Sequence, residues 1–176
     1  MSATQKEEAL GIDIGGVIID SAVNDGTATA LHGDNYLQTT QVKHSFETIS
    51  GLVRQRFGSR VYLVSKCGVA IQRKTREWLQ ARDFFAKTGV SPLNLWFCKE
   101  HHEKAEICRE LGISHFIDDR LEVLGHLATV PNLYLFCPRQ EEVHEFARFL
   151  PLVTKADGWT SIYVSLLGQT TTAKTL

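Results

Sequence analysis

The chain has 176 residues, which is enough for one domain with a sizeable core and too few for two ordinary ones. It has 19 Lys and Arg against 20 Asp and Glu, and a formal net charge of −1 does not indicate a nucleic-acid-binding or membrane-binding protein. No apolar run approaches the length of a membrane span, and the polar residues 1–8 do not resemble a signal peptide.

The cysteines are scattered along the chain, without a Cys-x-x-Cys pair. This pattern favours buried free thiols in a reducing compartment over a disulfide framework or a metal site. We therefore expect a cytoplasmic protein without a membrane partner. The four cysteines are Cys67, Cys98, Cys108 and Cys137.

Short apolar runs alternate with longer amphipathic runs, which is typical of an α/β domain. Five strands with helices between them predict a doubly wound three-layer α/β/α sandwich with a central parallel sheet. Gly58, Gly89 and Gly112 each follow a helical run, where a left-handed cap favours glycine. The expected strands are Ala9–Ile14, Val61–Val64, Leu93–Phe97, His115–Ile117 and Leu133–Phe136, and the expected helices are His44–Phe57, Ala70–Lys87, Glu103–Leu111, Arg120–Ala128 and Gln140–Leu150.

Two segments depart from this alternation. Asp20–Tyr36 is rich in Asp, Asn, Gly and Thr, and we expect it to form a small flap, either a projecting hairpin or a loop. Thr154–Leu176 contains one strand-like piece, Ser161–Leu167, and residues 168–176 are expected to form a disordered tail. We expect residues 1–176 to form one domain.

Polar side chains follow three of the expected strands. Ligands of open α/β sheets bind beyond the carboxyl ends of the strands, so these side chains are expected to meet at one edge. Carboxylates, a hydroxyl and an ammonium at one edge can hold a hard divalent cation and neutralise a phosphoryl group. The residues are Asp13 with Gly15 and Gly16, Ser65 with Lys66, Asp118 with Asp119, and Lys104, which lies in the helix before the fourth strand.

With these motifs in this order, the sequence resembles the haloacid dehalogenase superfamily. The first motif of that family, a strand ending in Asp-x-Asp-Gly-[Thr/Val], is matched by residues 13–17, Asp-Ile-Gly-Gly-Val. The second, a strand ending in Ser or Thr, is matched by residues 62–65, and the third, a lysine, by Lys104. The fourth, an acidic pair after a strand, is matched by residues 115–119.

The resemblance implies a magnesium-dependent phosphomonoester hydrolase. Asp13 would attack phosphorus and form an aspartyl-phosphate. Asp13, Asp118 and the backbone carbonyl of Gly15 would coordinate magnesium, and Asp119 would support the metal directly or through water.

The resemblance also implies how a phosphorylated substrate would be held. Ser65 would donate a hydrogen bond to a phosphoryl oxygen, Lys66 would bind phosphate, and Lys104 would offset the charge of the nucleophile and the phosphate. The family inserts its cap domains after the first motif or between the second and third. Neither gap leaves room for a full cap here, so we expect a capless member.

One position departs from the family pattern. The usual phosphatases carry a second Asp, a general acid and base, where this chain has Gly15, although some members work with glycine there. A general acid is typically worth about 10²–10⁴-fold in rate. Asp20, Asp25, His32 and Asp34 are candidate replacements. The alternative function is a phosphate- or protein-binding domain of the same fold with little or no turnover.

Other interpretations of single motifs are weaker. Residues 11–16 also resemble the phosphate loop of actin-like sugar kinases, but those need roughly twice this length, and the Gly-x-Gly-x-x-Gly of dinucleotide-binding folds is absent. His101-His102-Glu103 is interpreted as a polar helix start, because adjacent helical side chains point apart. Cys67 is interpreted as a small packed residue and not as a reactive thiol.

Overall fold

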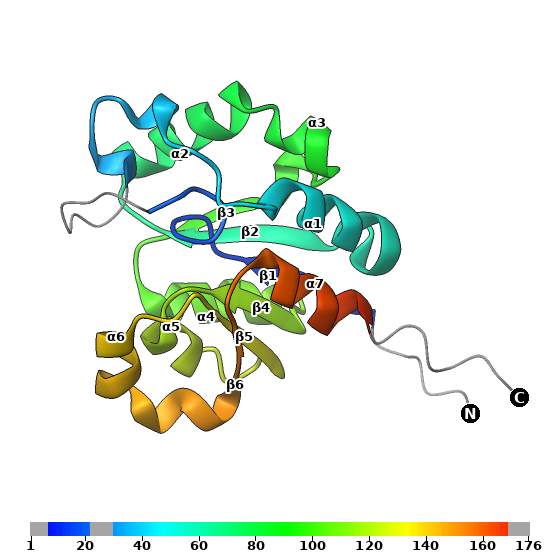
Figure 1. Ribbon diagram of the computed structural model, residues 1–176, viewed down its shortest axis with the longest axis vertical. Coiled ribbons are helices and arrows are strands. Elements are labelled where there is room, and N and C mark those ends of the chain that lie inside the picture. Colours follow the sequence, from blue (N-terminus) through cyan, green and yellow to red (C-terminus); the bar gives the residue numbers. More distant parts are fainter. Residues whose placement is uncertain (1–6, 22–29, 169–176) are drawn as a thin grey trace, which may run out of the picture.

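The computed structural model describes residues 7–21 and 30–168. Six parallel strands form one sheet in the order β3-β2-β1-β4-β5-β6, flanked by helices on both faces (Figure 1). This confirms the predicted α/β sandwich and its five predicted strands, and adds a sixth at the edge. The strands are β1 (Leu10–Ile12), β2 (Val61–Lys66), β3 (Leu95–Cys98), β4 (His115–Asp118), β5 (Asn132–Phe136) and β6 (Val153–Ala156).

Seven α-helices occur in the described part of the chain, and none of them is long and apolar enough to cross a membrane. The three glycines expected after helices all have positive φ, of 55°, 79° and 62° for Gly58, Gly89 and Gly112. The helices are α1 (Ser45–Leu52), α2 (Val69–Ala81), α3 (Phe84–Thr88), α4 (His101–Glu110), α5 (Leu121–Gly125), α6 (Gln140–Glu145) and α7 (Trp159–Leu167).

Two apolar cores lie on the two faces of the sheet. Helices α1, α2, α3 and α7 pack on one face, where Phe46, Trp78 and Trp159 are buried. Helices α4 and α5 pack on the other, around Phe116 and Leu124. Because both faces are covered, the central strands are apolar on both sides, which explains why their sequences are continuous apolar runs.

The strand order reverses between β1 and β4, and this reversal positions the site. After β1 the chain runs outward through β2 to β3, then returns to β4 on the other side of β1. Ile12 pairs with Ile117, so the residues that follow, Asp13 and Asp118, leave the sheet side by side. The N–H of Asp13 donates to the carbonyl of Ile117 at 2.9 Å. Ligand sites of open α/β sheets lie at such a reversal.

Two helix predictions are wrong in their boundaries. The helix expected over Ala70–Lys87 is broken, because Asp83 adopts a left-handed conformation with φ of 54° and α3 starts after it. The break lets Phe84 pack edge-on against Phe46 in the core. The helix expected over Gln140–Leu150 ends as α6 at Glu145, and a 3₁₀ helix follows over Ala147–Leu152.

The strand-like interpretation of Ser161–Leu167 is also wrong. This segment belongs to α7, whose buried residues Trp159, Ile162 and Leu166 recur at the three- and four-residue spacing of a helix. The strand of this region is β6, which the prediction missed. Only four residues long, β6 lies at the sheet edge and includes Thr154 and Lys155, both exposed. The expected tail lies outside the described residues beyond Gly168.

The segment expected to form a flap is described in part, since residues 22–29 lie outside the described chain. Its part after this gap lies against α2: Lys74 donates to the carbonyl of Gly33 at 2.9 Å, and the Tyr36 hydroxyl hydrogen-bonds Glu77. Next to it, Trp78 donates to the carbonyl of Thr39 at 2.9 Å.

Close packing at Gly11 of β1 gives the first prediction. A Cβ at this position would lie 2.3 Å from the ring of the buried Phe116, so we expect Gly11→Ala to lower the free energy of unfolding by about 1–3 kcal/mol. Urea denaturation measures this loss. The matched control is Gly158→Ala, because a Cβ there meets nothing within 4 Å. Equal stability of Gly11→Ala and Gly158→Ala would contradict the close contact between Gly11 and Phe116.

Candidate active site

A buried ammonium group joins the ends of β1 and β4. The Lys104 Nζ atom lies 2.9 Å from Asp13 Oδ1 and 2.7 Å from Asp118 Oδ2, and the residue is only 1% exposed. Lys104 lies in the first turn of α4, which packs against β2 and β3. Three elements that are distant in sequence therefore meet in one charged cluster.

The acidic pair after β4 is held by different partners. Asp118 Oδ1 accepts a hydrogen bond from the backbone N–H of Arg120 at 2.9 Å, and Asp119 Oδ2 accepts one from Arg139 at 3.2 Å. One carboxylate oxygen from each of Asp13, Asp118 and Asp119 lies within 4.8 Å of the others. The spacing of these oxygens would allow the acidic cluster to hold a cation.

The turn after β1 holds Asp13 in place. The N–H groups of Ile18 and Ile19 donate to the carbonyl of Ile14, and all three side chains are buried. The indole N–H of Trp159 donates to the carbonyl of Val17 at 2.7 Å, which ties the turn to α7.

Within this turn, Gly16 has φ of 77°, and a Cβ there would lie 2.5 Å from Asp119 Oδ2. Glycine is therefore required at this position for both backbone conformation and space.

Burial and mutual repulsion perturb the three ionisable groups. Burial, together with the charge of Asp118, raises the pKa of Asp13 to about 6 in spite of the opposing charge of Lys104. Burial and the charges of Asp118 and Asp13 raise the pKa of Asp119 to about 7. Burial alone would lower the pKa of Lys104, but Asp118 and Asp13 raise it above its ordinary value, so the ammonium stays charged.

The acidic cluster lies in a cavity of about 590 Å³. Ser65 at the end of β2 is buried in its wall, and Lys66 and Arg139 also line it. The cavity thus has a negative floor with cations around it. Its lining also includes Gly15, Ser21, His32, Cys67, Thr75 and His101.

The donor set fits a hard divalent cation. Asp13, Asp118 and Asp119 offer only oxygen, the ligand type of magnesium and calcium. Burial is the largest cause of the raised pKa values of Asp13 and Asp119, and the neighbouring carboxylates add to it. Three carboxylates share only one ammonium and one half-exposed guanidinium, so ionised carboxylates are in excess. A cation at this position would relieve that excess.

All seven residues predicted for the site line this one cavity: Asp13, Gly15, Ser65, Lys66, Lys104, Asp118 and Asp119. Of the candidate replacement acids, His32 lines the cavity, whereas Asp20 and Asp34 do not. Asp25 lies outside the described residues.

The cavity residues that were not predicted include Arg120, Arg139 and His101. Arg139 follows β5 by three residues, so the rule that strand ends form the site would have found it. The sequence predicted only a polar helix start at His101 and its neighbours. Among these, Glu103 caps α4 by accepting from the N–H groups of Lys99 and Glu100, and His102 is exposed, as a polar helix start implies.

Cys67 also lines the cavity, but its thiol is not activated. Burial and the nearby charge of Asp13 raise its pKa to about 11, so little thiolate forms at neutral pH. All four cysteines are free thiols; Cys98 and Cys108 are buried, whereas Cys137 is exposed, which the sequence did not predict.

No protein-family model matches this sequence, and no curated protein matches it significantly. Function therefore has to be inferred from the side chains of the cavity.

The proton affinity of Asp119 gives the second prediction. Its folded pKa of about 7 lies above the ordinary 3.8, so its contribution to stability is fully present below about pH 4 and is lost as pH rises through 7. Asp119→Asn removes this proton site. With EDTA present, raising the pH from about 5 to about 8 should lower the free energy of unfolding of the parent by about 1–3 kcal/mol more than that of Asp119→Asn.

Urea denaturation across this pH range measures both proteins. Burial lowers the pKa of His115 to about 4, so its contribution to stability is lost as pH falls below its ordinary 6.5. That opposite trend is common to parent and variant and cancels in the difference. Parallel pH profiles would show that Asp119 does not bind the extra proton.

Proposed function

We propose that this chain is a capless, magnesium-dependent phosphomonoester hydrolase of the haloacid dehalogenase type, which acts through an aspartyl-phosphate on Asp13. The observation that carries the proposal is the bridge from Lys104 to Asp13 and Asp118 at the strand-order reversal, on the floor of an accessible cavity. The order of motifs along the sequence supports the same assignment.

Asp13 is suited to act as the nucleophile. Its pKa of about 6 leaves the carboxylate mostly ionised at neutral pH, and Lys104 and the β1 turn fix its position. Attack of a carboxylate oxygen on phosphorus forms a P–O bond and breaks the ester P–O bond, and the leaving group departs as an alkoxide or phenolate that takes a proton from water. A second water then attacks the same phosphorus and breaks its bond to Asp13, which frees the carboxylate and releases inorganic phosphate.

Magnesium would be held by Asp13, Asp118 and Asp119, with the carbonyl of Gly15 as a further oxygen at the cavity wall. When bound, it supplies Lewis-acid stabilisation of charge on the phosphoryl oxygens.

The cations of the cavity would bind the phosphoryl group. Ser65 at the end of β2 offers a hydroxyl donor, and Lys66 and Arg139 line the same wall. Lys104 is already shared by two carboxylates, so its function would be to position Asp13 and limit its basicity. Substrate charge would then be neutralised mainly by Lys66, and in part by Arg139, which also contacts Asp119.

Gly15 favours the second candidate function, a domain that binds phosphate without efficient turnover. Glycine at this position cannot transfer a proton to the leaving group. Among the described lining residues, His32 and His101 carry imidazoles that could do so. The two functions differ in whether an ester bond is cleaved, and both require the same cation and phosphate groups.

The third prediction tests the nucleophile. Asp13→Asn keeps the shape of the side chain and removes its charge, so we expect magnesium-dependent hydrolysis of an aryl phosphate to fall by at least about 10³-fold. The control is Asp34→Asn, an exposed carboxylate that does not line the cavity. Undiminished hydrolysis by folded Asp13→Asn would rule out the nucleophile. If the parent binds magnesium and phosphate but cleaves no ester, the second function holds.

The fourth prediction concerns Gly15. Without a positioned acid, turnover depends on how readily the leaving group departs unprotonated, so the parent should cleave aryl phosphates about 10²–10⁴-fold faster than alkyl phosphates. Single-turnover rates with both ester types measure the ratio while chemistry limits the rate. Equal rates would mean that another residue supplies the proton, and His32→Gln and His101→Gln would then identify it.

A further inference from the structure

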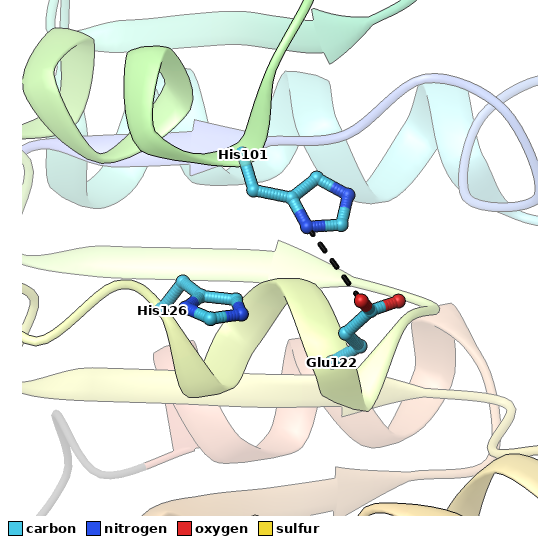
Figure 2. A group of neighbouring side chains, drawn as sticks. All are labelled: His101, Glu122 and His126. Atoms are coloured by element: carbon cyan, nitrogen blue, oxygen red, sulfur yellow. Dashed lines mark ion pairs between the residues drawn. The ribbon is translucent and has the colours of Figure 1, made fainter.

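Three metal-binding side chains from two helices meet outside the acidic cluster. His101 is the first residue of α4, Glu122 lies in α5, and His126 follows the last residue of α5. Figure 2 shows the three side chains grouped in the space between the two helices. One ligand atom from each lies within 4.8 Å of the others.

The geometry is close to that of a three-ligand metal site. His101 Nδ1 lies 3.9 Å from Glu122 Oε1, and the His101 and His126 ring centroids are 5.8 Å apart. Two ligands at the ordinary zinc distances of about 2.0–2.2 Å in a tetrahedral site lie about 3.3 Å from each other. Because His126 is exposed and the other two side chains are half-buried, small rotations would close the difference.

The electrostatics of the three side chains also suit a metal. Burial and the charge of Lys66 lower the pKa of His101, which keeps its ring neutral and able to coordinate. Arg120 donates to the other Glu122 oxygen, Oε2, at 3.1 Å, so Oε1 is left facing His101. Such outer contacts orient metal ligands. Lys66 and Arg120 are both cationic, and their repulsion of a dication limits the affinity.

We propose that His101, Glu122 and His126 form a second cation site, for zinc or a metal of similar ligand preference. Two imidazoles and one carboxylate are a zinc donor set, whereas magnesium prefers oxygen ligands alone. Three protein ligands leave a coordination position for water or a bound anion.

The site would lie at the rim of the Asp13 cavity. His101 lines that cavity, and together with His126 it also lines a neighbouring hollow of about 390 Å³. Lys66 lines both spaces. Helix α4 thus carries a residue of each site, His101 at the rim and Lys104 on the cavity floor, three positions apart.

Cobalt binding to the untagged protein tests this fifth prediction. With magnesium in large excess to saturate the oxygen ligands, we expect one equivalent of Co²⁺ to give visible d–d bands, and Zn²⁺ to displace it. His126→Ala and His101→Ala should each weaken Co²⁺ binding by at least about tenfold. The matched control is His144→Ala, an exposed histidine on α6 that does not belong to the group of three ligands. Circular dichroism verifies that each variant is folded.

Asp118→Asn separates this site from the proposed active site. We expect it to abolish magnesium binding and to leave the cobalt spectrum unchanged. No cobalt binding by the parent, or undiminished binding by His126→Ala, would overturn the proposal. Loss of the spectrum in Asp118→Asn would place the ion in the acidic cluster instead, and a thiolate charge-transfer band would place it on a cysteine. Each of these four results is independent of whether the protein hydrolyses phosphate esters.

Discussion

The ammonium group of Lys104 is buried between two carboxylates, and the geometry of the cavity floor depends on this contact. Removing an ion from water costs several kcal/mol even after relaxation, so a buried lysine persists only where opposite charge surrounds it. Asp13 and Asp118 supply that charge, but together with Asp119 they supply more than one ammonium and the half-exposed Arg139 neutralise. The same contact that stabilises the lysine therefore leaves a negative floor, which a divalent cation would complete.

The strand order explains why these groups meet. Ile12 of β1 and Ile117 of β4 pair in register. Asp13 and Asp118 each follow one of these residues, so the two carboxylates lie at the ends of neighbouring strands. The packing between β1 and β4 is tight, because the ring of Phe116, the register partner of Gly11, occupies the space beside it. The turn after β1 is equally constrained, since Gly16 lies against Asp119. Backbone positions that have no room for a side chain thus fix the carboxylates that the chemistry would use.

The parallel sheet and most of the residues at its strand ends could be predicted from the sequence. Both faces of the sheet are covered, so its strands are apolar runs, and polar residues follow them. The predicted cavity residues other than Lys104 followed from those strand ends. Features decided by tertiary contacts could not be predicted: the break after α2 depends on the packing of Phe84, and β6 is a short, partly polar edge strand. Ser161–Leu167 contains Ile162, Tyr163 and Val164, which favour strands, and only the spacing of its buried residues identifies a helix. His101 and His126 are 25 positions apart, so no local pattern connects them.

The two proposed cation sites have different ligand types, so they would select different metals. The cavity floor offers oxygen alone and is buried, whereas the rim offers two imidazoles and one carboxylate and is half-exposed. Hard magnesium prefers the first set, and zinc prefers the second. Lys66 lines both spaces, and its charge already lowers the pKa of His101. An anion bound to Lys66 in the cavity would partly neutralise the charge of this lysine, so that Lys66 would repel a cation at the rim less strongly. By linkage, the rim cation would strengthen anion binding by the same factor, so anion and rim cation would bind cooperatively.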